Sequence, residues 1–168
     1  MSSAPVWYEL SMGELGVLES PGAADNPKVL AYAKDAGIDK IVNADSVPWC
    51  AAFVGAMLHR AGIQGSGKAN AKSYLQWGVR LNGPVLGCVV VLDRPPHDWQ
   101  GHVGFYVGRP SIGKIRILGG NQGDMVCQAD FDSGRINQFR WPVGLPIQPM
   151  WVGPIPVTGP VLTNPSDR

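Results

Sequence analysis

The sequence has few cysteines to cross-link a fold and no long apolar run to span a membrane. Its three cysteines in 168 residues are an odd number, which excludes a framework made only of disulfides. No run of about 20 consecutive apolar residues occurs, so we expect no transmembrane segment. Met1 to Pro5 contain no basic stretch and no apolar core follows them, so we expect no signal peptide and synthesis in a reducing cytoplasm.

The sequence also has almost no net charge. The 14 Lys and Arg residues nearly balance the 13 Asp and Glu residues, which leaves a formal net charge of +1. No cluster of basic residues is present, so the sequence does not predict a nucleic-acid partner.

Metal-binding motifs are missing as well. Cys88, His97, His102 and Cys127 could form a two-Cys, two-His set, but their spacings match no compact zinc motif and there is no His-Glu-x-x-His. Cys88 and Cys127 lie in apolar, strand-like runs, which favours a place in the core. We therefore expect no metal and no cofactor.

The residues that are present predict a single α+β domain. Apolar residues make up 45% of the chain, and 22 glycines and 15 prolines predict many turns and short elements. The periodicity is helical in the first half and alternates in the second, which predicts helices packed on one face of an antiparallel sheet. The expected helices are 6–16, 28–36 behind an Asn26 cap, a third helix carrying Cys50, and 71–77; the expected strands are 88–92, 102–107, 114–118, 125–129 and 136–140.

Regular patterning stops near Pro142. Prolines and glycines then recur every few residues, so we assign 1–142 to the domain and 143–168 to an extended tail. Trp151 is the residue most suited to pin the earlier part of this tail, and we expect its last residues to be disordered.

Cys50 is the first candidate for chemistry. Ser46 or Asp45 can cap a helix, Pro48 suits its first turn, and apolar residues then recur at three- and four-residue steps until Gly62. Cys50 would thus lie in the first turn, where the helix dipole favours a thiolate. The alternative is that Cys50 is a small buried hydrophobic residue beside Trp49.

A nucleophilic cysteine needs a base, and three histidines compete for that role. His59 follows Cys50 by nine residues in the same helix, about 13 Å along its axis, and cannot reach it. His97 lies in a Pro-rich loop. His102 opens an expected strand behind Gly101, on the face opposite the apolar stripe, and is the preferred base; its alternative is a hydrogen-bonded structural histidine.

Asn121 is the candidate for orienting that base. Gly119 and Gly120 allow the chain to turn sharply and would place the Asn121 amide at a strand end, within reach of the distal ring nitrogen of His102. The alternative is that Asn121 only stabilises its own turn.

Three segments together resemble a known family. Pro-Trp-Cys-Ala-Ala-Phe-Val (48–54), Gly-His-Val-Gly-Phe-Tyr (101–106) and Leu-Gly-Gly-Asn-Gln (118–122) are similar to motifs of the papain-like NlpC/CHAP cysteine hydrolases, in particular a small phage-associated branch. The resemblance covers roughly 6–142. It implies Cys50 as nucleophile, His102 as base and Asn121 as orienting residue, with Asp45, Trp49, Gly101 and Gln122 near the substrate or the oxyanion.

The resemblance implies an endolysin-like peptidoglycan hydrolase. It would cut an amide of the stem peptide or the muramoyl–L-alanine bond, act as a monomer on the cell wall, and reach the wall by holin-type export, lysis or virion delivery. A secreted antibacterial amidase toxin would use the same chemistry. A non-catalytic wall-binding or virion module that retains the fold is the alternative from another class.

Overall fold

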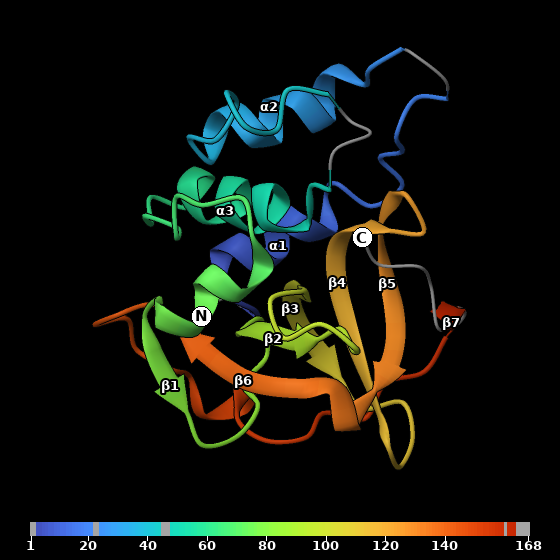
Figure 1. Ribbon diagram of the computed structural model, residues 1–168. Helices are drawn as coiled ribbons and strands as arrows, with labels where there is room; N and C mark the ends of the chain where they lie inside the picture. The colour runs from blue at the N-terminus through green and yellow to red at the C-terminus, as the bar shows by residue number, and fades with distance from the viewer. Residues whose placement is uncertain (1–2, 22–23, 45–47, 160, 164–168) are drawn as a thin grey trace.

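The computed structural model describes residues 3–21, 24–44, 48–159 and 161–163. It has the predicted α+β architecture, in which helices from the first part of the chain stack on one side of a sheet (Figure 1). The helices are α1 (Val6–Met12), α2 (Pro27–Asp35) and α3 (Cys50–Arg60), with the short 3-10 helices η1 (Ala71–Gln76), η2 (Ser133–Arg135) and η3 (Pro149–Trp151). The strands are β1 (Val79–Leu81), β2 (Val89–Asp93), β3 (Gly101–Gly108), β4 (Lys114–Gln122), β5 (Met125–Asp132), β6 (Ile136–Trp141) and β7 (Leu162–Thr163).

The sheet has the strand order β1-β6-β2-β3-β4-β5-β7. Strands β2 to β5 follow one another as an antiparallel meander, because the connections between them are too short for a parallel crossover. Strand β6 returns across the molecule and pairs with β1 and β2, also antiparallel. The short β7 pairs with β5 in parallel.

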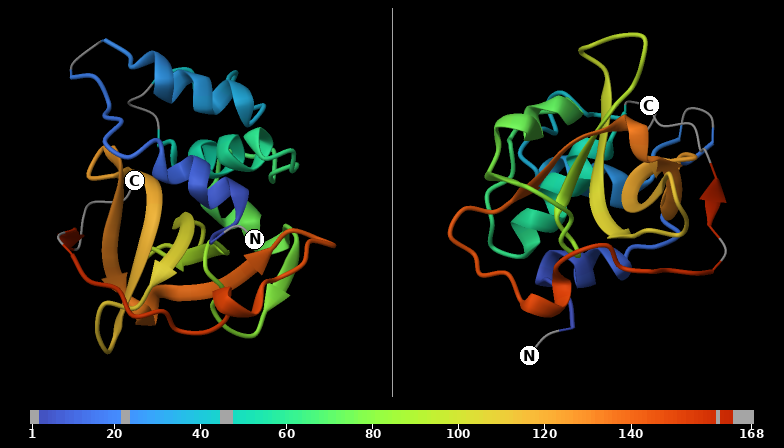
Figure 2. Two further views of the ribbon diagram at one scale, coloured as in Figure 1. Left: turned by 180° about the vertical axis from the view of Figure 1, so that it is seen from behind. Right: turned by 90° about the horizontal axis from the view of Figure 1, so that it is seen from below.

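The helices are layered on the sheet through α3. Helix α3 contacts β3 and β4, α1 contacts both α3 and β4, and α2 contacts α3 and lies farthest from the strands (Figures 1 and 2). Since α3 is covered on both sides, every residue from Cys50 to Leu58 is buried. Among the described helices, none combines the length and the apolar character needed to cross a membrane.

Several boundaries differ from the sequence prediction. The Asn26 cap is confirmed, since its side chain accepts a hydrogen bond from the Lys28 backbone N–H. Helix α1 ends at Met12, four residues early, because the N–H of Gly13 closes the last turn on Glu9 and Leu10. Segment 71–76 is a 3-10 helix, β1 was not expected, and β4 continues four residues beyond Leu118 to Gln122.

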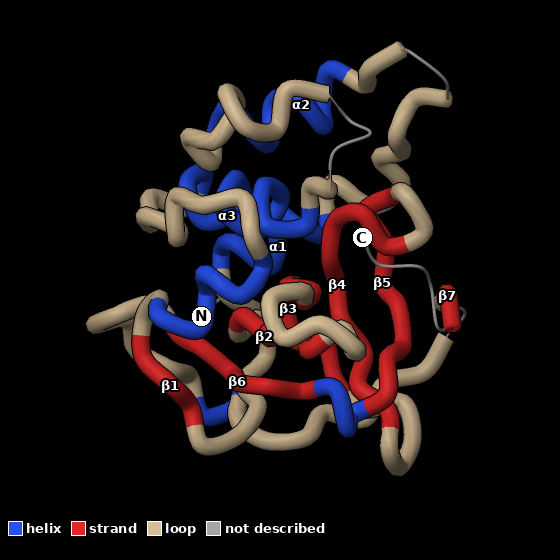
Figure 3. The backbone as a smooth tube through the Cα atoms, viewed as in Figure 1, coloured by secondary structure: helices blue, strands red, loops and turns tan. Residues whose placement is uncertain are grey.

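The described residues after Pro142, 143–159 and 161–163, lie against the sheet as loop, η3 and β7 (Figure 3). Trp151 is buried and packs on Trp141 with ring centroids 6.2 Å apart. This confirms the prediction that Trp151 anchors the earlier part of the segment. Further along, the N–H of Arg109 donates to the carbonyl of Ile155 at 2.7 Å. The predicted disorder of the last residues concerns 164–168, which lie outside the described residues.

Candidate active site

Cys50 is the first residue of α3 and is buried, with 4% of the residue exposed. Trp49 is the N-cap, with φ −126° and ψ 17°, so Pro48 lies before the helix and not in its first turn as predicted. The structure therefore places Cys50 one step closer to the free backbone N–H groups of the helix end than the sequence indicated. Ser46 and Asp45, the two predicted caps, lie outside the described residues.

Trp49 is packed in the core. Its indole N–H donates to Glu19 Oε1 at 2.8 Å, its rings stack on Tyr32 at 6.0 Å, and no part of it is exposed. These two contacts fix Trp49 at the entry to α3, and its predicted place near the substrate or the oxyanion stays a prediction.

His102 is the second residue of β3 and is fully buried. Its ring lies 5.3 Å from the ring of Phe131 on β5. Its Nε2 atom lies 2.9 Å from Oε1 of Gln122 at the end of β4. His102 Nε2 is therefore paired with Gln122, the residue after the predicted Asn121.

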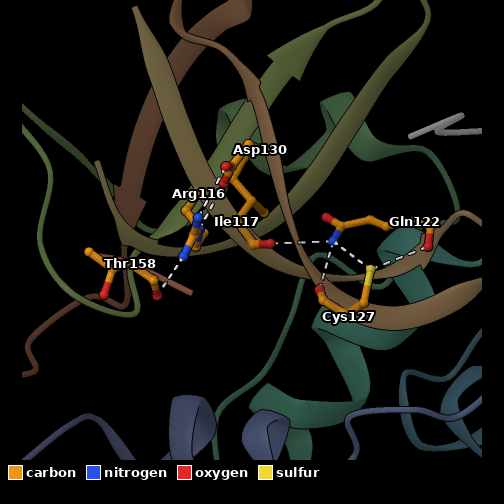
Figure 4. Close-up of polar contacts among 6 residues, drawn as sticks. All are labelled: Arg116, Ile117, Gln122, Cys127, Asp130 and Thr158. Atoms are coloured by element: carbon orange, nitrogen blue, oxygen red, sulfur yellow. Dashed lines mark hydrogen bonds and ion pairs between the residues drawn. The ribbon is translucent and has the colours of Figure 1, made fainter. Parts of the chain in front are cut away.

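The amide of Gln122 has only one possible orientation. Its Nε2 lies 2.7 Å from the carbonyl oxygen of Cys127 and 3.3 Å from that of Ile117, as Figure 4 shows. Carbonyl oxygens only accept, so the amide nitrogen must face them and Oε1 must accept from His102. The proton of a neutral His102 is therefore held on Nε2, which makes Nδ1 the basic nitrogen.

Gly119 and Gly120 allow neighbouring groups to pack closely on β4. A Cβ on Gly119 would lie 2.6 Å from Gln122 Oε1 and 3.4 Å from His102 Nε2. A Cβ on Gly120 would lie 2.7 Å from atoms of Trp49 and Phe53. Gly119 thus borders the His102–Gln122 pair and Gly120 borders the start of α3, so the two groups contact neighbouring residues of β4.

A β-bulge explains why Gln122 and not Asn121 meets His102. Gly119 pairs with Cys127 and Gln122 pairs with Met125, so two residues of β4 oppose the single Val126 of β5. In a regular strand Gly119 and Asn121 would share a face, but one extra residue reverses the alternation. Asn121 occupies the bulge with φ +57°, a left-handed conformation that asparagine tolerates better than most residues.

Asn121 remains unusual in another respect. It is fully buried, and neither Oδ1 nor Nδ2 finds a hydrogen-bond partner within the described part of the chain. A buried polar group without a partner costs about 1–3 kcal/mol, so such an amide in a folded protein requires an explanation.

Gly101 is half-buried at the start of β3, where a Cβ would lie 2.7 Å from the carbonyl oxygen of Leu92 and 3.1 Å from Cγ of Lys72. The glycine is thus required for strand packing beside His102.

The two other histidines, which compete with His102 for the role of base, are exposed. His59 is exposed near the end of α3, and His97 is exposed in the β2–β3 loop, where it stacks on Trp99 with centroids 5.4 Å apart. Within the described ranges no group of three or more His, Cys, Asp or Glu side chains has an arrangement that could hold a metal ion.

The two other cysteines have poorly ionising thiols. Cys88 is fully buried, and that burial raises its pKa to about 12. Burial also raises the pKa of the half-buried Cys127, while a hydrogen bond from Gln122 lowers it by less. Both thiols are therefore protonated at neutral pH.

Comparisons of the chain with known protein families, with curated proteins and with solved structures returned no match.

Proposed function

We propose that this protein is a papain-like cysteine amidohydrolase that cuts peptidoglycan, either within the stem peptide or at the muramoyl–L-alanine bond. One observation carries the proposal: Gln122, fixed by two backbone carbonyls, holds the His102 proton on Nε2 and leaves Nδ1 basic. A structural histidine needs no such control of its tautomer, whereas a general base does.

Cys50 supplies the nucleophile in this proposal. Its thiol loses a proton to Nδ1 of His102, and the sulfur attacks the carbonyl carbon of the scissile amide. The positive end of α3, which has 11 residues, favours the thiolate, and backbone N–H groups there stabilise the oxyanion.

The tetrahedral adduct collapses when His102 returns the proton to the leaving amine, and a thioester on Cys50 remains. Water then gives a proton to His102 and attacks the thioester, which releases the carboxylic acid and restores the thiol. No redox step or metal enters this sequence. The unpartnered amide of Asn121 is a candidate to bind a substrate amide.

The test is digestion of purified sacculi with the full chain, followed by identification of the new amino termini. New alanine amino termini indicate the muramoyl–L-alanine bond, and new internal stem-peptide amines indicate an endopeptidase. If neither appears with any wall chemotype, the non-catalytic wall-binding module becomes the better account.

A further inference from the structure

A polar pocket of about 420 Å³ lies beside η1, between that helix and the segment before it. Ser66, Lys68 and Asn70 line one part, and Ser73, Gln76 and Trp77 line another. Its volume is in the range of small-ligand sites, and its lining offers hydroxyl, amide and ammonium groups with one aromatic wall.

The walls of the pocket are fixed by hydrogen bonds. Ser73 Oγ lies 2.7 Å from the Asn70 carbonyl and 2.7 Å from Ser66 Oγ. Because the carbonyl only accepts, Ser73 donates to it and accepts from Ser66. The Trp77 indole N–H donates to the carbonyl of Gln64 at 2.8 Å. The site is therefore built before any ligand arrives.

The charge of the pocket is positive. None of its lining residues is acidic. Lys72 is compensated, because its Nζ lies 3.0 Å from Asp93 Oδ1 and also donates to the Asp98 carbonyl. Lys68 is exposed and makes no ion pair with any residue the structure describes, so it is the cation open to a ligand.

Two contacts connect the pocket to the candidate active site. The stem of Lys72 packs on Gly101, directly before His102. On the other side, the Tyr74 hydroxyl packs on two glycines: a Cβ on Gly65, which lines the pocket, would lie 2.9 Å from it, and a Cβ on Gly55 of α3 would lie 3.4 Å from it. Tyr74 thus lies between the pocket and the helix that begins at Cys50.

We infer that this pocket is a substrate subsite that binds a carboxylate-bearing peptide segment, with Lys68 as its charged contact and the polar side chains of η1 as partners for the peptide amides. The inference rests on the proposed function and adds to it the charge of the preferred substrate: free carboxyl groups on the stem peptide favour binding, and amidated ones do not.

Calorimetry tests the inference with two synthetic stem peptides, one with free carboxyl groups and one with the same groups as carboxamides. Both are titrated into the full chain carrying Cys50→Ala, so that no turnover occurs. We expect the free acid to bind about three- to tenfold more tightly. Adding Lys68→Gln should reduce that ratio to about one, whereas adding Lys28→Gln, an exposed lysine of α2 on the outer helix layer, should leave it unchanged.

A ratio near one before Lys68 is changed, the same ratio after Lys68→Gln, or no binding of either peptide would overturn the subsite. These outcomes are independent of sacculus digestion. Cleavage of sacculi with an unchanged ratio refutes only the subsite. Loss of the ratio on Lys68→Gln without any cleavage refutes only the hydrolase.

Discussion

At the scale of single residues, Gln122 is the side chain that fixes the tautomer of His102, because its Oε1 accepts a hydrogen bond from Nε2. The sequence could identify His102, because a histidine behind a glycine on the non-apolar face of a strand is already unusual. It could not choose between Asn121 and Gln122, since both follow the glycines and both carry an amide. That choice depends on one bulge residue, and a bulge has no reliable signature in a single sequence.

Gln122→Ala should lower kcat by about 10–1000-fold, or about 1.4–4 kcal/mol of barrier, because His102 loses the acceptor that fixes its tautomer. The loss should be non-additive with His102→Ala, because an orienting residue has no effect once the base is gone. A double-mutant cycle on kcat measures this. Asn121→Ala is the matched control, since its amide makes no hydrogen bond to His102 and its effect should not show that coupling. Full additivity of the Gln122 and His102 changes would refute the orienting role.

The three thiols should differ in their rates of alkylation at neutral pH. The raised pKa values of Cys88 and Cys127 leave almost no thiolate, so iodoacetamide should modify them slowly in the folded protein. Cys50 should react first and its modification should abolish activity, whereas all three should react in denaturant. Peptide mapping by mass spectrometry gives the order, and early modification of Cys88 would contradict it.

At the scale of elements, Gly119 and Gly120 of β4 let the groups of the candidate site pack closely on this strand. The alternating sequence of 114–118 predicts the strand but not its continuation through two glycines, which have low strand propensity. They are tolerated because Trp49, Phe53 and the Gln122 amide fill the space where their side chains would be.

Gly119→Ala should therefore disturb catalysis more than folding. Its methyl group would lie 2.6 Å from Gln122 Oε1 and must displace the amide that holds His102. We expect a fall in kcat of at least about tenfold with a stability loss of about 1–3 kcal/mol, measured by turnover and thermal unfolding. Gly134→Ala is the control, because a Cβ there meets nothing within 4 Å. Equal kcat values in both variants would show that the contact does not matter.

At the scale of the whole molecule, the described residues after Pro142, 143–159 and 161–163, are part of the fold. The sequence predicted Trp151 as their anchor from size and apolarity alone. The later contacts escaped prediction because they are made by backbone groups, such as the Ile155 and Thr158 carbonyls, which any sequence supplies. Arg116 joins this segment to the sheet: it pairs with Asp130 through two hydrogen bonds of 2.8 and 3.1 Å and donates to the Thr158 carbonyl at 3.0 Å (Figure 4).

Asp130→Ala should lower the free energy of unfolding by about 3 kcal/mol, because it leaves the buried Arg116 guanidinium without its counter-ion. Asp132→Ala removes the partner of Lys114 in an exposed pair and should barely change the melting temperature. Chemical denaturation of both variants tests the difference. Equal stability would mean that the buried pair does not hold the C-terminal segment.

The most direct test of the whole account is the rate at which Cys50→Ala releases peptide from purified sacculi, compared with the unchanged chain. Circular dichroism must first show that the variant is folded. Because every step of the proposed chemistry passes through the Cys50 sulfur, we expect a rate at least about 1000-fold lower. Release by the folded variant at a rate near that of the unchanged chain would contradict the account.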